Sequence, residues 1–260
     1  MDSHDDRLRR LYDDKKRALE AQGSYTLKRL EDAFHQRATG TYLKDLVFGA
    51  NDGIVTTFAV VAAAAGAGLE AFVVIILGVA NLLADGLSMG LGNFLGEKSD
   101  EAYNRGQRQK EYWEIKHFPE IERNEVRAVF KKWGFSGQLL EQAIHQVVAD
   151  PDRWVDFMMR EELGIVESED SGGAAKHGVA MFFAFVIAGF IPLIAYVLPN
   201  VPSPFLVSTV LAGLTFCAVG SLRAKFTPTR WWVAGLEVLL IGGIASAVAY
   251  GIGRVLERIV

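Results

Sequence analysis

The stretch from Ala71 to Gly96 runs AFVVIILGVANLLADGLSMGLGNFLG, and Asp85 is its only charged residue. As a helix rising about 1.5 Å per residue, it would be long enough to cross a hydrocarbon core of about 30 Å. A soluble domain rarely contains an uncharged apolar run of this length. The stretch therefore predicts a transmembrane helix, and it decides the fold class of the chain.

Four further apolar runs have the same character. The first of them has Asp52 as its only charge, and only Glu70 separates it from the stretch above, which predicts a tight hairpin. Half of the 260 residues are hydrophobic. We therefore predict an all-α membrane protein with five transmembrane helices. The four runs are residues 46–69 and about 178–198, 204–222 and 231–253.

The segment between the second and third apolar runs is polar. Residues 97–176 contain seventeen acids and twelve bases, so no part of them can span a membrane. Pro119, Gly134 and Pro151 predict breaks between short helices. The expected division is a polar, amphipathic N-terminal segment (1–45), transmembrane helices 1 and 2 (46–96), an inserted helical domain (97–176) and transmembrane helices 3 to 5 (177–260).

The basic residues predict the orientation of the spans. Segments 1–45, 97–176 and 223–230 contain ten, twelve and three Lys or Arg, and the turns at 70 and 199–203 contain none. The positive-inside rule therefore places the N-terminus and the inserted domain in the cytoplasm and the C-terminus outside. The sequence does not say which membrane this is. A net charge of −4 gives no general attraction to nucleic acid.

Several polar groups lie inside the predicted spans, where ionisable residues are costly and usually functional. Asp45 and Asp52 fall on one face of the first span. In the second span Asn81, Asp85 and Met89 recur every four residues. The alternatives are structural: Asp52 could bond a loosened backbone beside glycine, and Asp85 could be a packing contact. The fifth span contains Glu237, for which interhelical pairing and a role in transport are equally open.

Four glutamates in the inserted domain form two pairs of identical spacing, Glu111 with Glu114 and Glu122 with Glu125. Pro119 between them predicts a corner, so each pair would belong to its own helix. Like charges three residues apart destabilise a bare helix, and a bound cation would relieve the repulsion. The structural alternative is a solvated helix face, on which interspersed Lys and Arg residues form salt bridges with the glutamates.

A cluster of acids and sulfur follows in the same domain. Met158 and Glu162 are four residues apart, and a thioether beside carboxylates favours softer divalent ions such as Fe²⁺. Glu114 and His117 form E-x-x-H, the spacing found in di-iron bundles. Such sites need a second copy of the motif, so an iron-oxidising enzyme is the weaker hypothesis.

These stretches together resemble the vacuolar iron transporter family. The resemblance covers about residues 40–253 and includes the two E-x-x-E pairs. It implies a five-helix homodimer with an ion path at the subunit interface and a helical cytosolic metal-binding domain between spans 2 and 3. The matching motifs are DLVFGANDGIVTTFAVV (45–61), GVANLLADGLSMGLGNFLG (78–96), DRWVDFMMREELG (152–164) and GLEVLLIGGIASAVAYGIG (235–253).

The resemblance also implies roles for particular residues. Asp52 and Met89 would lie in the ion path, and the cytosolic metal ligands would be Glu111, Glu114, Glu122, Glu125, Met158 and Glu162. Many relatives have an acid at the place of Asn93, and an amide there cannot carry a proton. Asp45, Asn81, Asp85 and Glu237 are the further candidates for the path.

The function hypothesis is secondary transport of Fe²⁺ out of the cytosol in exchange for protons. A carboxylate can hold either a metal or a proton, and no ATP-binding P-loop motif is present. Mn²⁺, Co²⁺ and Zn²⁺ also suit a carboxylate–thioether site, and no cofactor is expected. The rivals are a membrane-anchored metal buffer or sensor and, less favoured, the iron-oxidising enzyme. The expected partners are lipid, divalent metal ions, protons and a second copy of the chain.

Overall fold

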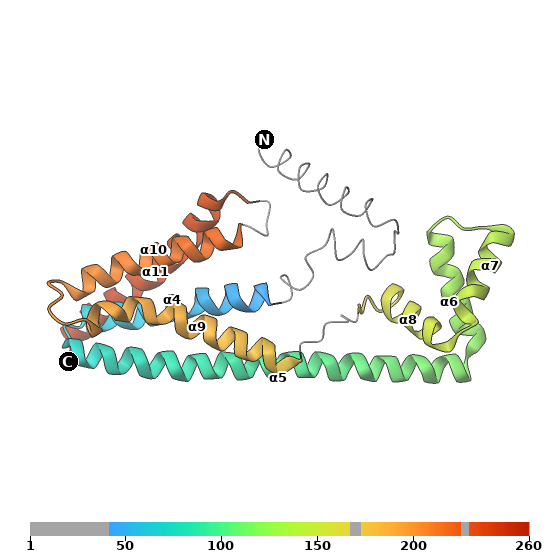
Figure 1. Ribbon diagram of the computed structural model, residues 1–260, viewed down its shortest axis with the longest axis horizontal. Helices are drawn as coiled ribbons and strands as arrows, with labels where there is room; N and C mark the ends of the chain where they lie inside the picture. Colours follow the sequence, from blue (N-terminus) through green and yellow to red (C-terminus); the bar gives the residue numbers. More distant parts are fainter. Residues whose placement is uncertain (1–41, 167–172, 225–228, 260) are drawn as a thin grey trace, which may run out of the picture. The chain divides into compact units, whose positions relative to one another are not determined.

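The computed structural model describes residues 42–166, 173–224 and 229–259 (Figure 1). These residues form helices and no strands, which confirms the all-helical class. The prediction for the N-terminal segment 1–45 lies almost wholly outside them. The helices are α4 (Leu43–Gly66), α5 (Ala71–His117), α6 (Pro119–Lys132), α7 (Gly137–Val148), α8 (Pro151–Glu161), α9 (Ala174–Val197), α10 (Pro204–Arg223) and α11 (Trp231–Glu257).

Five of these helices, α4, α5, α9, α10 and α11, are long and apolar enough to cross a membrane. They are the five spans that the sequence predicts, in the same order. The hairpin between the first two is longer than expected, because α4 ends at Gly66 and α5 begins at Ala71. Gly68 in this turn has a φ of 67°, a left-handed conformation that favours glycine.

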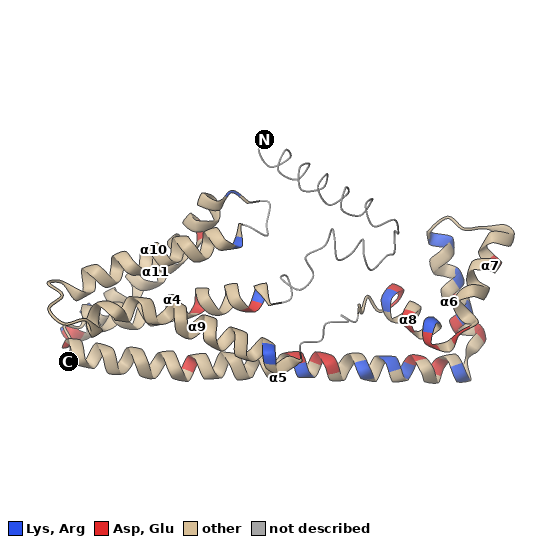
Figure 2. Ribbon diagram, viewed as in Figure 1, with Lys and Arg blue, Asp and Glu red and all other residues tan. Residues whose placement is uncertain are grey.

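The second span differs from its predicted end. We expected it to stop at Gly96, but α5 continues to His117 as one helix of 47 residues. The polar half contains no proline and only one glycine, Gly106, so the backbone has no reason to break where the apolar side chains end. In Figure 2 the acidic and basic residues are concentrated along this half of α5 and on α6 and α8.

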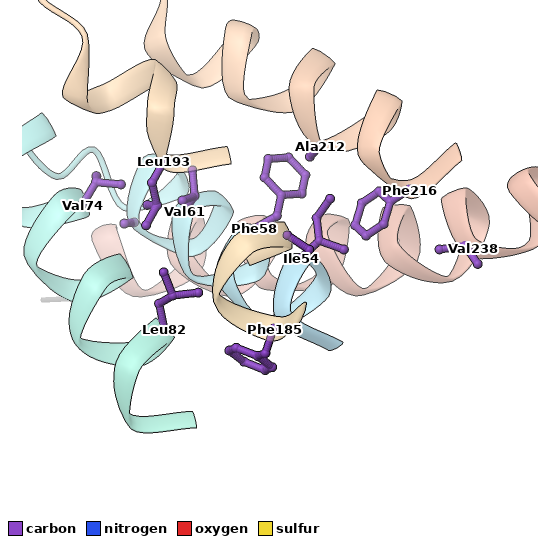
Figure 3. Close-up of a cluster of buried hydrophobic side chains, with 12 residues drawn as sticks. Ile54, Phe58, Val61, Val74, Leu82, Phe185, Leu193, Ala212, Phe216 and Val238 are labelled. Carbon is purple, nitrogen blue, oxygen red and sulfur yellow. The ribbon is translucent and has the colours of Figure 1, made fainter. Parts of the chain in front are cut away.

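The chain divides into two compact units. The first unit (1–90 and 177–260) contains α4, the beginning of α5, and α9, α10 and α11, and its core is apolar (Figure 3). Ile54 and Phe58 of α4 pack there with residues of the other four helices. The other members of this core include Val74, Leu82, Phe185, Leu193, Phe216 and Val238.

Glycines bring α4 and α9 together backbone to backbone. A Cβ atom added to Gly53 would overlap the carbonyl oxygen of Phe185. A Cβ atom added to Gly189 would lie 2.6 Å from the carbonyl oxygen of Gly53. Such small-residue contacts are how membrane helices approach closely. The crossing lies directly beside Asp52, so that the position of this acid is fixed by the packing of two helices.

The second unit (Leu91–Lys176) contains the rest of α5 with α6, α7 and α8. Its helices begin and end where the sequence predicts: α6 begins at Pro119, Gly134 follows it with a φ of 90°, and α8 begins at Pro151. Asp150 caps α8, accepting a hydrogen bond from the Arg153 N–H at 3.0 Å. The core of the unit consists of Val126, Phe130, Leu140, Ile144, Val147, Trp154, Phe157 and Met158.

Candidate metal-binding cluster and ion path

Five glutamates of the second unit interact through their charges. Glu111 and Glu114 come from the end of α5, and Glu122 and Glu125 from the first half of α6. Glu162 immediately follows α8. The break between α5 and α6 turns the chain, and the two pairs thereby become neighbours across a corner. We call these five residues the glutamate cluster.

Two members of the cluster each have one buried carboxylate oxygen that lacks a hydrogen-bond partner in the described part of the chain. Glu111 is only 2% exposed to solvent, and Glu122 is only 5% exposed. The Oε2 atom of each is enclosed and has no hydrogen-bond partner among the described residues. A buried carboxylate that lacks a partner is strongly unfavourable, so native proteins rarely keep one without a functional reason. A proton or a cation would satisfy these oxygens.

The electrostatics of the cluster follow from this burial. Burial, followed by the charges of Glu162 and Glu114, raises the pKa of Glu111 to about 7. Burial also raises the pKa of Glu122 to about 7, with Glu125 and Glu111 as the next causes. The pKa of Glu162 is raised mainly by burial as well. Near neutral pH Glu111 and Glu122 therefore exchange protons readily, and a divalent ion would compete with those protons.

Salt bridges neutralise only some of the glutamates in and around the glutamate cluster. Lys110 pairs with Glu114 at 3.2 Å. Arg127 pairs instead with Glu141 of α7, also at 3.2 Å. Neither Glu111 nor Glu122 has an ion pair with an Nζ or guanidinium group among the described residues. A solvated face of paired charges therefore explains Glu114 but does not explain the two buried carboxylates.

The cluster is not a closed coordination shell. Within the described ranges, no group of three or more His, Cys, Asp or Glu residues is arranged to hold a metal ion. Met158 is fully buried and packs in the apolar core of the unit, so its role as a ligand remains a prediction. Like charges repel one another, and a divalent ion bound among these carboxylates would draw them together.

Two polar contacts that sequence reasoning missed fasten α8 to α5. The Tyr112 hydroxyl donates to Asp152 at 2.5 Å, and Arg108 pairs with Asp156 at 2.6 Å. The partners are 40 and 48 residues apart, so no local spacing connects them. They fix the position of α8, and therefore of Glu162 at its end. We call these two contacts the α8 clasp.

The candidate path residues of the first unit lie on neighbouring spans. The carboxyl groups of Asp52 on α4 and Asp85 on α5 are near enough for their charges to interact. Asn81 has a buried amide nitrogen without a partner among the described residues. Met89 is partly buried and packs against the apolar core of the first unit. Thr56 donates to the backbone oxygen of Asp52 at 2.9 Å and leaves the carboxylate untouched.

The remaining candidates have specific partners. Asp45 is buried and contacts His177 of α9, with Nδ1 and Oδ2 2.5 Å apart. Glu237 forms an ion pair with Arg223 of α10. The side chain of Glu237 is 49% exposed, and its pairing joins two spans, whereas its role in transport stays a prediction. The pairing is possible because both residues lie near the connection between α10 and α11.

The E-x-x-H residues Glu114 and His117 do not form part of a metal centre in the described residues. The Nδ1 atom of His117 is 2.7 Å from the carbonyl oxygen of Trp113, and the two rings stack. Glu114 is paired with Lys110. These contacts are local to the last turns of α5 and give no support to an iron-oxidising site.

The fold and these groups define a multi-pass helical membrane protein with acids inside its spans and a carboxylate cluster suited to cations. Comparison with known families agrees: the profile of the VIT family matches residues 43–254. The chain belongs to this family. The match includes both the spans and the glutamate cluster.

Named relatives support the same assignment. The chain is 32% identical over 235 residues to the vacuolar iron transporter of Toxoplasma gondii, a match covering 87% of this chain and 78% of that protein. It is 32% identical over 220 residues to vacuolar iron transporter 1 of Arabidopsis thaliana, covering 84% and 88%. The vacuolar iron transporter of Plasmodium berghei is 32% identical over 234 residues, covering 86% of each chain.

Proposed function

We propose that this protein transports divalent metal ions, Fe²⁺ foremost, across a membrane in exchange for protons and out of the cytosol. The observation that carries the proposal is membership of the VIT family over residues 43–254, with relatives named as iron transporters. The acids on neighbouring spans supply sites that a cation requires inside a membrane. A protein that only bound metal ions, without transporting them, would not need acids inside its spans.

The glutamate cluster would collect the metal. On the proposed topology the second unit faces the cytosol, where it would load Fe²⁺ from dilute solution. Glu111 and Glu122 have pKa values near 7, so metal binding would release protons from them at cytosolic pH. Glu114, Glu125 and Glu162 would complete an oxygen-rich shell as the cation draws the carboxylates together. Met158 would bias the shell toward softer ions if its sulfur turned out of the core.

Transfer through the membrane would use the acids of the spans. Asp52 and Asp85 repel each other when both are ionised, and either a divalent ion or protons relieve that repulsion. A cation bound between them would leave when protons arrive from the opposite side. The proton gradient thereby supplies the driving force, and the metal and the protons occupy the same carboxylates in turn. Asn81 and Met89 would offer additional neutral ligands along this route.

The proposal is tested by metal uptake into proteoliposomes containing the full chain. We expect Fe²⁺ flux through the wild type and a loss of at least about tenfold for Asp52→Ala, because the span then lacks its first carboxylate. Asp100→Ala, which changes an exposed acid of the second unit, is the matched control and should leave the flux unchanged. An Asp52→Ala protein that moves Fe²⁺ at the wild-type rate would refute the path.

The homodimer implied by the family resemblance remains part of the proposal. α5 exposes a leucine at every fourth position, including Leu83 and Leu87 at 46% and 53%. In a membrane, either lipid or a second copy of the chain would cover such a face. The mass of the detergent-solubilised protein, measured by light scattering, checks this expectation: twice 28.5 kDa supports the dimer.

A further inference from the structure

An acid and an imidazole that are both largely buried connect the beginnings of α4 and α9. The side chains of Asp45 and His177 are 3% and 14% exposed, and Oδ2 and Nδ1 are 2.5 Å apart. An ionised carboxylate can only accept a hydrogen bond, so Nδ1 carries the hydrogen and donates it. The ring of Tyr42 packs against the imidazole at 4.8 Å. This contact gives the buried Asp45 carboxylate a hydrogen-bond partner, which burial of a charged group requires.

The pair lies where three helices of the candidate path meet. Asp45 is seven residues before Asp52, two turns away on the same face of α4. Next to His177, the backbone of Gly178 comes so near to α5 that a Cβ atom on Gly90 would be 2.9 Å from its carbonyl oxygen. Gly90 directly follows Met89. The pair is therefore at the level of Met89, at the end of the first unit from which α4 starts.

We propose that His177 is a positioning residue of the ion path, which holds the Asp45 carboxylate in place by its Nδ1–H. This inference rests on the proposed transport function. Without the imidazole, the Asp45 carboxylate would be buried with one bond fewer, and it would turn away or take up a proton. The beginning of α4 would then shift against α9, and the two turns between Asp45 and Asp52 would transmit the shift to the path.

The test compares two replacements of His177 in full-length protein in proteoliposomes, with Fe²⁺ as the transported ion. Asparagine has an amide N–H near the position of Nδ1, so His177→Asn keeps the bond to Asp45 but cannot ionise. We expect it to retain flux within about threefold of the wild type, whereas His177→Leu, which removes the bond, should lose about tenfold. His145→Leu, at an exposed position of α7, is the matched control and should have no effect.

A second measurement separates positioning from general packing. If His177 acts through Asp45, His177→Leu should reduce the flux no further in an Asp45→Ala background, and the melting temperatures of the single and double variants in detergent should be non-additive. Full flux in His177→Leu, equal losses in His177→Asn and His177→Leu, or additive losses would overturn the role of His177. Wild-type protein without any Fe²⁺ flux would overturn the proposed function itself, which is a different result from an active wild type with an active His177→Leu.

Discussion

Replacing Glu111 by glutamine should make the metal-free protein more stable and at the same time impair metal binding. Glutamine has nearly the same shape as glutamate but no charge to bury. Glu111 is 2% exposed, and its Oε2 atom has no hydrogen-bond partner among the described residues. The substitution therefore removes a buried charge at a position that gains nothing from it until a cation binds.

The magnitude follows from the pKa. Burial raises the pKa of Glu111 from 4.5 to about 7, and each pKa unit corresponds to about 1.36 kcal/mol. At pH 8 the buried charge therefore lowers the free energy of unfolding by about 3 kcal/mol. A buried amide without full hydrogen bonding would offset about 1 kcal/mol of this. We expect a net stabilisation of about 2 kcal/mol for Glu111→Gln at pH 8.

The pH dependence has a definite sign. Because the folded pKa of Glu111 is the higher one, the folded state binds more protons than the unfolded state between about pH 4.5 and 7. The contribution of Glu111 to stability is therefore most favourable below the unfolded pKa and is lost as the pH rises through 7. Glu122 has the same sign, because burial raises its pKa to about 7 as well. The advantage of Glu111→Gln should be present at pH 8 and absent at pH 5.

The assay is thermal unfolding of the full chain in detergent, followed by tryptophan fluorescence. Three of the five tryptophans, Trp113, Trp133 and Trp154, lie in the unit that contains the cluster. Fe²⁺ added at pH 8 should raise the melting temperature of the wild type and not that of Glu111→Gln. Glu120→Gln, which changes an exposed glutamate of α6, is the matched control and should produce no stabilisation at either pH.

Two results would refute this reasoning. The first is a Glu111→Gln protein that melts no higher than the wild type at pH 8. The second is a stabilisation of equal size at pH 5 and pH 8, because a gain that ignores pH cannot come from removing a titrating charge.

Three further predictions follow from the packing and electrostatics. Tyr112→Phe removes one bond of the α8 clasp without unfolding the protein. It should weaken Fe²⁺ binding to the full protein about threefold, measured by isothermal titration. Unchanged affinity would mean that the clasp does not position the glutamate cluster. Gly53→Ala forces a Cβ atom into the α9 backbone and should lower the melting temperature sharply. Gly243→Ala places its Cβ atom in open space and should leave the melting temperature unchanged. Equal melting temperatures of the two variants would contradict the close crossing of α4 and α9. Apparent Fe²⁺ affinity should fall several-fold from pH 8 to pH 6 as protons occupy Glu111 and Glu122, and binding that is constant over this range would speak against these two ligands.

The fold could be predicted from the sequence because membrane spans follow from a length and a composition. Each apolar run forms a helix. The breaks between the shorter helices lie at Pro119, Gly134 and Pro151, as the backbone preferences of proline and glycine predict. The end of the second span could not be predicted in the same way. Hydropathy changes at Gly96, but the hydrogen bonds of α5 do not depend on whether its side chains face lipid or water, so the helix continues.

Only those features of the candidate site that depend on residues close together in the sequence could be predicted. The spacing of Glu111 with Glu114 and of Glu122 with Glu125 is visible in the sequence, and Pro119 predicts the corner between the pairs. Their unequal burial is not visible, because it depends on how α6 to α8 pack around them. The placement of Met158 in the apolar core likewise depends on that packing.

Long-range pairs were beyond sequence reasoning. His177 and Asp45 are 132 residues apart, and a histidine after a lysine at the start of an apolar run has no pattern that indicates its partner. Glu237 was recognised as an unusual acid, but its exposure and its pairing with Arg223 depend on the crossing of α10 and α11. In each case the missing information is the contact between helices that the chain order does not specify.

The most direct test of the account is a simultaneous measurement of metal and proton movement in proteoliposomes that contain the wild-type protein. A pH-sensitive dye and an Fe²⁺-sensitive dye are enclosed in the vesicles, and Fe²⁺ is added outside with no initial pH gradient. The account predicts that Fe²⁺ entry makes the lumen more alkaline as protons leave, and that an acidic lumen accelerates the entry. Fe²⁺ entry with no change of lumenal pH, at a rate that is the same with and without a pH gradient, would contradict it.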